Sequence, residues 1–173
     1  MSENFIEKCL KKCPVFVDHY RVLRSTYARS LGLVKFTTSC TIVCMNLVSG
    51  TNIFLAVALN EPEKGNIIRL TSNYDAIAPE ILPYEIGNAL TAMLKRKQIT
   101  KEEAILTLKI ATQIPVRLLT VDISMALKLA LKFNIYAYDA YFLQCAKSLS
   151  CPLITLDKRM KQVASDLNIQ VLE

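Results

Sequence analysis

The sequence has no tryptophan, one histidine and only four glycines in 173 residues. So little glycine excludes collagen-like and linker-like chains. The longest unbroken apolar run, Ile53 to Leu59, has seven residues, whereas a membrane-spanning helix needs roughly 18 or more. Residues 1–30 carry charges and no continuous apolar segment, which excludes an ordinary secretory signal.

The scarcity of histidine also limits the chemistry. The only histidine is His19, so residues 45–173 contain none. A Ser-His-Asp triad or a Cys-His nucleophile pair is therefore excluded within that part of the chain. Neither of the glycine-rich phosphate motifs, G-x-x-x-x-G-K-S/T and G-x-G-x-x-G, occurs in the sequence, so nucleotide binding of those types is not indicated.

What the chain does have is a globular composition, with 52% hydrophobic and 21% charged residues. This length and composition predict one domain with an additional segment. The net charge of +6 is too mild to indicate a nucleic-acid-binding protein by itself. Six cysteines in a chain without an export signal predict reduced thiols and a cytoplasmic protein.

From Met45 onward, short β-like runs alternate with helical patterns. Strands are predicted at 41–49, 75–78, 116–121, 152–156 and 169–172, and helices at 52–60, 62–70, 83–97, 100–113, 122–133, 138–149 and 158–167. Thr100 followed by Glu103 forms a capping-box pattern at the start of one helix. Because strands that alternate with helices indicate a parallel sheet covered on both faces, we predict an α/β fold, a three-layer α/β/α sandwich.

Three acids stand where such a sheet collects functional groups, beyond the carboxyl ends of its strands. Asp157 directly follows a predicted strand, Asp139 lies in the first turn of a helix, and Glu85 lies one turn into the helix that Pro83 opens. Converging carboxylates repel one another unless a cation holds them, and hard oxygen ligands suit Mg²⁺ or Mn²⁺. Spacing alone leaves a second interpretation open, in which two of these acids cap helices and Glu85 is a rim charge.

Four segments carry a resemblance to a known family: MNLVSGTNIFLAVAL, APEILPYEIGNAL, YAYDAYFLQCAKSLSCPLITLDKRM and a closing strand. The specific feature is their combination, a Glu in a Pro-led helix, then YDA, then TLD with its Asp eighteen residues after the Asp of YDA. On these motifs the chain from Met45 to Glu173 resembles the PIN-domain family, especially the VapC-type toxins of bacterial toxin–antitoxin pairs.

The resemblance implies a Mg²⁺-dependent (or Mn²⁺-dependent) endoribonuclease that is held in check by a cognate antitoxin and forms a homodimer. The acids of the family map onto Glu85, Asp139 and Asp157 as metal ligands and catalytic residues. Thr51, Asn52 and Thr155 match the supporting positions of its motifs. Lys158 and Arg159 follow the last acid and are candidate contacts to RNA phosphates, or a solvated helix face.

One position departs from the pattern of the family. The first strand of the family normally ends in an Asp, and Gly50 stands there in this chain, directly before Thr51 and Asn52. Glycine has no side-chain oxygen, Ser49 points to the opposite face of the strand, and Asn52 would supply a neutral oxygen through a water. We therefore expect either a ribonuclease toxin with reduced or no activity, or a non-catalytic PIN-fold protein that binds antitoxin and dimerises.

The segment 1–44 lies outside the resemblance, and we expect it to be poorly ordered and not part of the folded domain 45–173. Met45 stands where family members begin, which an upstream start codon would explain. A zinc site built from Cys9, Cys13, Cys40 and Cys44 and a basic arm that touches RNA are alternatives.

Two further predictions concern apolar residues. Cys145 lies among Phe142, Leu143 and Ala146 in a helical pattern, so we expect it to be a core thiol. The apolar helices at 53–59 and 81–94 are candidates for a dimer or antitoxin surface, or for plain core.

Overall fold

Four short parallel strands form the centre of residues 45–173, the part of the chain that this computed structural model describes. The sheet order is β3-β2-β1-β4, and Val48 of the central strand pairs with Ile77 on one side and Leu153 on the other. Since all strands run in one direction, their carboxyl ends meet at a single edge of the sheet. The strands are β1 (Met45–Ser49), β2 (Tyr74–Pro79), β3 (Arg117–Leu119) and β4 (Leu153–Ile154).

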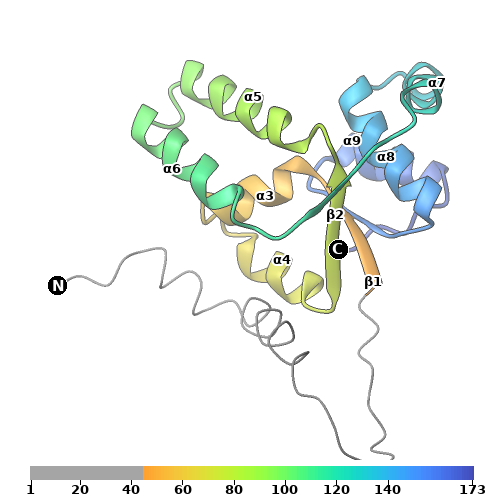
Figure 1. Cartoon of the computed structure of the whole chain (residues 1–173), viewed down its shortest axis with the longest axis horizontal. Coiled ribbons are helices and arrows are strands. Elements are labelled where there is room, and N and C mark those ends of the chain that lie inside the picture. The colour runs from red at the N-terminus through yellow and green to blue at the C-terminus, as the bar shows by residue number, and fades with distance from the viewer. Residues whose placement is uncertain (1–44) are drawn as a thin grey trace, which may run out of the picture. The chain divides into compact units, whose positions relative to one another are not determined.

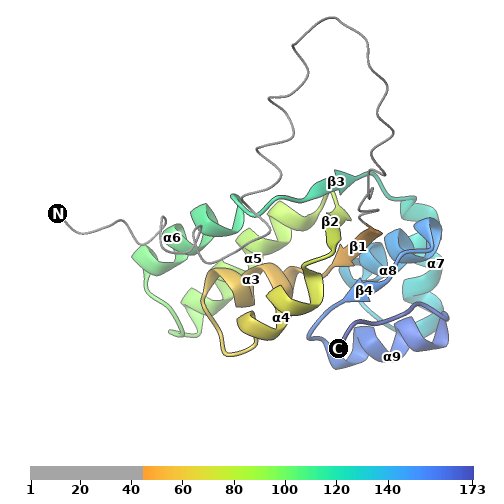
Figure 2. The ribbon, with the colours of Figure 1, turned by 90° about the horizontal axis from the view of Figure 1, so that it is seen from below.

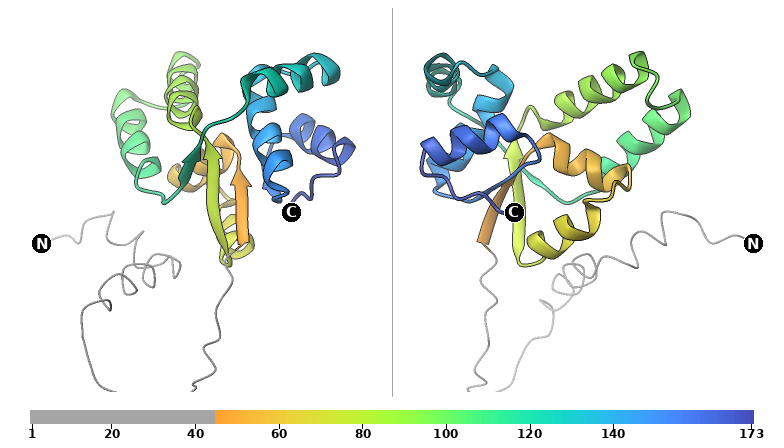
Figure 3. Two further views of the ribbon diagram at one scale, coloured as in Figure 1. Left: turned by 45° about the vertical axis from the view of Figure 1, so that its right-hand side comes forward. Right: turned by 180° about the vertical axis from the view of Figure 1, so that it is seen from behind.

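Helices cover both faces of this sheet (Figure 1), and the views in Figures 2 and 3 show the same two groups. One face carries α3 to α6, and the other carries α7 to α9. The predicted three-layer α/β/α sandwich is confirmed. The helices are α3 (Thr51–Ala58), α4 (Lys64–Thr71), α5 (Leu82–Lys95), α6 (Lys101–Ala111), α7 (Ile123–Phe133), α8 (Ala137–Leu149) and α9 (Lys158–Asp166).

Local sequence signals account for where several helices begin. The predicted capping box is present: the Thr100 hydroxyl accepts from the Glu103 N–H, and the Glu103 carboxylate accepts from the Thr100 N–H. Asp122 and Asp157 each cap a helix by accepting a backbone N–H three residues further on. Each such cap stabilises its helix by about 1 kcal/mol.

The core is built around β1, β2 and α8. Cys145 is buried there, as predicted, and burial raises the pKa of its thiol to about 11. The apolar residues of the two segments considered as docking surfaces also lie largely inside, including Ile53, Phe54, Ile86 and Leu90. These side chains form core, and they are not available to a partner. No helix of residues 45–173 is both long enough and apolar enough to cross a membrane.

The last strands are shorter than predicted. The expected strand 152–156 is reduced to β4, because the N–H of Leu156 donates to the Asn52 side chain and that of Asp157 donates to Thr155. These side-chain hydrogen bonds take the place of the backbone hydrogen bonds that would continue the strand. The predicted strand 169–172 is wrong as a strand, since it reduces to one bridge between Leu153 and Val171 beside the two-residue β4.

The segment 1–44 and part of the predicted strand 41–49 lie outside the described residues. The predictions of an upstream start, a zinc site and a basic arm therefore stay predictions.

Candidate active site

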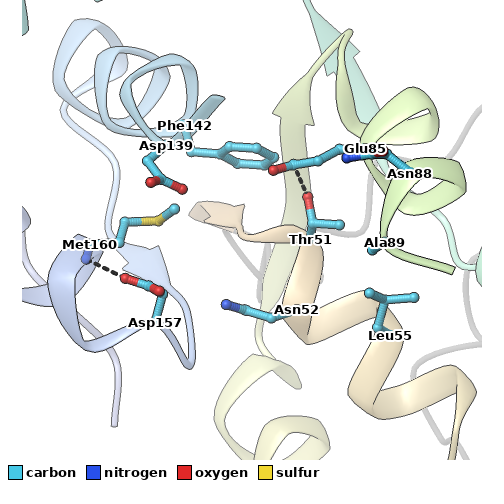
Figure 4. Close-up of a pocket in the computed structure, with 10 residues that line it drawn as sticks. All are labelled: Thr51, Asn52, Leu55, Glu85, Asn88, Ala89, Asp139, Phe142, Asp157 and Met160. Atoms are coloured by element: carbon cyan, nitrogen blue, oxygen red, sulfur yellow. Dashed lines mark hydrogen bonds between the residues drawn. The ribbon is translucent and has the colours of Figure 1, made fainter. Parts of the chain in front are cut away.

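A pocket of about 250 Å³ lies at the edge of the sheet where the strands end, and Figure 4 shows its lining. Its walls come from segments that are far apart in the sequence. All three acids singled out in the sequence contribute to it. The lining residues are Thr51, Asn52 and Leu55, Glu85, Asn88 and Ala89, Asp139 and Phe142, and Asp157 and Met160.

The acids reach the pocket because each stands at the start of a helix. Glu85 lies in the first turn of α5, Asp139 in the first turn of α8, and Asp157 is the N-cap of α9. Helices α5 and α9 follow β2 and β4, so a parallel sheet brings their first turns to one edge. The positive ends of helix dipoles at these positions partly offset the negative charge.

Glu85 is held by a residue of a different helix. The Thr51 hydroxyl, at the start of α3, donates a hydrogen bond to the Glu85 carboxylate. Burial raises the pKa of Glu85, the Thr51 hydrogen bond lowers it, and repulsion from Asp139 adds to the increase. Burial outweighs the hydrogen bond, so the pKa of this carboxyl is raised overall.

Asp139 interacts with both other acids, since it repels the Glu85 carboxylate and is itself repelled by Asp157. Burial raises the pKa of its carboxyl, and repulsion from Asp157 raises it further. The only salt bridge among the described residues joins Lys161 to Glu173, so no described cation pairs with the three acids. The pocket therefore concentrates negative charge that the described residues do not neutralise.

Asp157 is positioned by a small network at the link between β4 and α9. Asn52 accepts from the Leu156 N–H at 3.1 Å and donates to the Thr155 hydroxyl at 3.1 Å. The Thr155 hydroxyl in turn accepts from the Asp157 N–H at 3.1 Å. These bonds of Asn52 hold the link from which Asp157 projects. The water-mediated ligand role that the sequence suggested for Asn52 stays a prediction.

Gly50 lies next to this network. Its φ of −67° and ψ of 156° are ordinary extended values, so the backbone does not require glycine here. A Cβ added at Gly50 would lie 3.2 Å from Thr155 Oγ1 and 3.3 Å from Asn52 Oδ1. A side chain at this position would thus meet the two residues that position Asp157, and they would have to give by a few tenths of an ångström.

The donor chemistry of the pocket fits a hard divalent cation. Carboxylate oxygens of three acids, with the Thr51 hydroxyl nearby, are the oxygen ligands that Mg²⁺ and Mn²⁺ prefer. In residues 45–173, however, no three His, Cys, Asp or Glu side chains lie close enough together to hold a metal ion. Figure 4 shows Asp139 and Asp157 on one side and Glu85 on the other. A bound cation would have to draw these side chains together by rotation.

The two basic residues after Asp157 differ in their surroundings. The guanidinium of Arg159 donates to the Phe133 carbonyl at the end of α7, so this side chain ties two helices together. Lys158 is exposed beside Asp157. Their contact with RNA stays a prediction.

Half of the lining residues are not among the site residues predicted from the sequence, although a simple signal marks four of them. Leu55, Asn88, Phe142 and Met160 each stand three residues after a predicted site residue on the same helix. Residues three apart on a helix share a face. Applying that spacing to each candidate would have found them.

Comparison with known proteins gives the family. The family model of the PIN domain matches residues 50–166, so the chain belongs to the PIN domain family. No curated protein matches the chain.

Two solved structures resemble the fold. PAE2754 from Pyrobaculum aerophilum aligns with a TM-score of 0.53 and 20% identity, over 69% of this chain and 79% of that one. A chain of the VapBC2 structure from Rickettsia felis, in which VapBC2 is bound to a promoter DNA fragment, aligns with a TM-score of 0.54 and 17% identity. The alignment covers 75% of this chain and 100% of the matched chain. At these identities the likeness establishes the fold.

Proposed function

We propose that this protein is a metal-dependent endoribonuclease of the VapC toxin type, restrained by an antitoxin protein. The observation that carries the proposal is the meeting of Glu85, Asp139 and Asp157 in one pocket of a PIN domain. Each acid comes from a different helix start, and no described basic side chain pairs with them. The toxin–antitoxin setting is supported by the likeness to the VapBC2 structure.

A bound Mg²⁺ or Mn²⁺ would offset the charge on the phosphodiester and make a water more nucleophilic. Glu85, Asp139 and Asp157 would hold the cation through their carboxylates. Thr51 orients the Glu85 carboxylate by its hydrogen bond. Asn52 and Thr155 fix the backbone from which Asp157 projects.

Gly50 favours a second candidate, a non-catalytic PIN protein that binds antitoxin and dimerises. A carboxylate at this position would add a ligand at the edge of the pocket, and glycine offers none. Helix α7 also exposes three large apolar side chains at four-residue spacing, Ile123, Leu127 and Leu131, and a partner would cover such a face.

Cleavage of RNA separates the two candidates. The whole chain is incubated with a labelled structured RNA in Mg²⁺ or Mn²⁺, beside Asp139→Asn, Gly50→Asp and the neutral isostere Gly50→Asn. We expect slow cleavage by the unchanged chain, none by Asp139→Asn or with a chelator, and an increase of about a hundredfold or more for Gly50→Asp only, as for other charge-stabilising groups in active sites.

Two results would contradict the nuclease proposal. If neither the unchanged chain nor Gly50→Asp cleaves RNA, the non-catalytic candidate is favoured. If cleavage persists in Asp139→Asn, it comes from a contaminant or from another site.

A further inference from the structure

The two cysteines of residues 45–173 lie near each other at the end of α8. Cys145 is in the last turns of the helix and is 3% exposed, whereas Cys151 lies just beyond the helix and is partly exposed. Both are free thiols. Neither lines the acidic pocket, and Cys151 stands before the amino end of β4, while the pocket lies beyond the carboxyl ends of the strands. The pair is therefore separate from the proposed active site.

The turn that ends α8 brings these two residues together. Ser150 takes the left-handed conformation, with a φ of 51° and a ψ of 38°. Its N–H donates to the Lys147 carbonyl at 3.3 Å, and the Cys151 N–H donates to the Ala146 carbonyl at 3.0 Å. These bonds define a Schellman motif, in which the residue after the left-handed one packs against side chains one turn back in the helix. For Cys151 those residues are Ala146 and Cys145.

Packing and electrostatics agree with this placement. Cys151 packs against the core cluster that contains Cys145. Burial raises the pKa of both thiols, that of Cys145 to about 11; the Cys151 thiol adds to the increase at Cys145, and the Arg117 guanidinium opposes it at both. Because such effects fall off with distance, the two thiols lie near each other and near Arg117, which donates to Asn46 at 3.0 Å.

From this arrangement we infer that Cys145 and Cys151 are a redox-sensitive pair, which low-molecular-weight disulfides convert into an intramolecular disulfide. Cysteines can be bridged when their Cα atoms lie roughly 4.4–6.8 Å apart, and a residue folded back on its own helix can reach a thiol that is closed to solvent. The bond fastens the end of α8 to the start of β4. Asp139 starts α8 and Asp157 follows β4, so the bond joins the elements that carry these two acids. The inference does not depend on the proposed function.

The oxidation proceeds by two exchange steps that balance. The accessible Cys151 thiol loses its proton, and its sulfur attacks a small disulfide RSSR, which forms a mixed disulfide and releases one RS⁻. The Cys145 thiol then loses its proton and attacks the Cys151 sulfur, which closes the protein disulfide and releases the second RS⁻. The two released thiolates take up the two protons. Two protein thiols are thus oxidised, and RSSR is reduced to two RSH.

Peptide mapping of the whole chain tests the inference, because trypsin cuts between the two cysteines at Lys147. The chain is incubated with excess oxidised glutathione in mildly alkaline buffer, which favours thiolates. Remaining thiols are blocked with iodoacetamide, and the digest is analysed without reductant. We expect peptide 133–147 to be joined to peptide 148–158, and dithiothreitol to separate them.

Thermal unfolding provides a second readout and a matched control. A crosslink restricts the unfolded chain, so we expect the oxidised chain to melt about 5 °C higher than the reduced chain. Cys151→Ser keeps a side chain of similar size without the bond. Oxidised glutathione should leave the melting temperature of this variant unchanged, and Cys145, being buried, should resist iodoacetamide. The four cysteines of residues 1–44 are present in both chains, so the difference belongs to the pair.

Four results would overturn the inference. A stable glutathione adduct on Cys151 without the linked peptide would show that Cys145 is out of reach, and a digest with neither product would show that Cys151 does not react. A link from either cysteine to residues 1–44 or to a second chain would show that the two are not partners. A linked chain that melts no higher than the reduced chain would show that the bond does not belong to the folded state.

Discussion

Glu85 and Asp139 show at the scale of single residues that the pocket is arranged for charge at the expense of stability. Burial raises the pKa of both carboxyls, and repulsion along the row from Glu85 to Asp139 to Asp157 adds to it. Between the ordinary carboxyl pKa and the raised pKa, a folded protein with such acids holds more protons than the unfolded chain. Its stability therefore falls as pH rises from the ordinary carboxyl pKa through the raised values.

Neutralising either acid should thus stabilise the protein at neutral pH in the absence of divalent cations. We expect Glu85→Gln and Asp139→Asn to raise the melting temperature at pH 7, and the gain to disappear below about pH 4, where carboxyls are protonated in both states. Thermal unfolding followed by circular dichroism across pH measures this. Asp75→Asn, an exposed acid on β2, is the control, and an equal gain at every pH would contradict the explanation.

A divalent cation should restore the stability that the buried, repelling carboxylates remove, because a ligand that binds only the folded state stabilises it. We expect Mg²⁺ or Mn²⁺ to raise the melting temperature of the unchanged chain slightly, that of Gly50→Asp more, and that of Glu85→Gln with Asp139→Asn not at all. Gly50→Asn has nearly the same shape as Gly50→Asp without the charge. An equal shift in both Gly50 variants would show that a carboxylate at this position is not a ligand.

At the scale of elements, the start of α9 combines two tasks in one side chain. Asp157 caps the helix through the Met160 N–H at 2.6 Å, and it also lines the pocket. Asp122 caps α7 in the same way, through the Met125 N–H at 3.0 Å, and is not a lining residue. The pair allows the structural task to be separated from the proposed chemical one.

Substitutions at the two caps should therefore diverge. Asp157→Asn keeps a capping oxygen, so we expect near-normal stability and loss of divalent-dependent cleavage. Asp157→Ala should lose both, and Asp122→Ala should lose about 1 kcal/mol of unfolding free energy with cleavage intact. Chemical denaturation and the RNA cleavage assay measure the two effects. Normal cleavage by Asp157→Asn would remove this acid from the proposed ligands.

The same scale shows which elements a sequence can predict. Helices with a local start signal, such as Thr100 with Glu103 or Asp122, were predicted to within two residues of their ends. The strand 152–156 was predicted too long, because its ladder ends where a side chain 104 residues away, Asn52, takes the Leu156 N–H. Such a competition between distant groups leaves no local pattern.

At the scale of the whole molecule, the sequence likewise predicts some features of the site and not others. Glu85, Asp139 and Asp157 could be named because strand ends and family motifs mark them, and the structure brings all three to one pocket. The hydrogen bond from Thr51 to Glu85 and the occupied amide of Asn52 could not be predicted, since both depend on how α3 meets its neighbours. Whether these acids bind a cation stays a prediction.

The order of strands also sets when the pocket can exist during synthesis. The first strand, β1, is completed by pairing with the last, β4, and Asn52 meets Thr155 across 103 residues. A nascent chain that still has residues 153–157 inside the ribosome has neither this pairing nor Asp157 in place, although its earlier helices are free to fold. The pocket is therefore assembled only after β4 and the start of α9 have emerged, and the half of the domain that holds Thr51 and Glu85 does not form it alone.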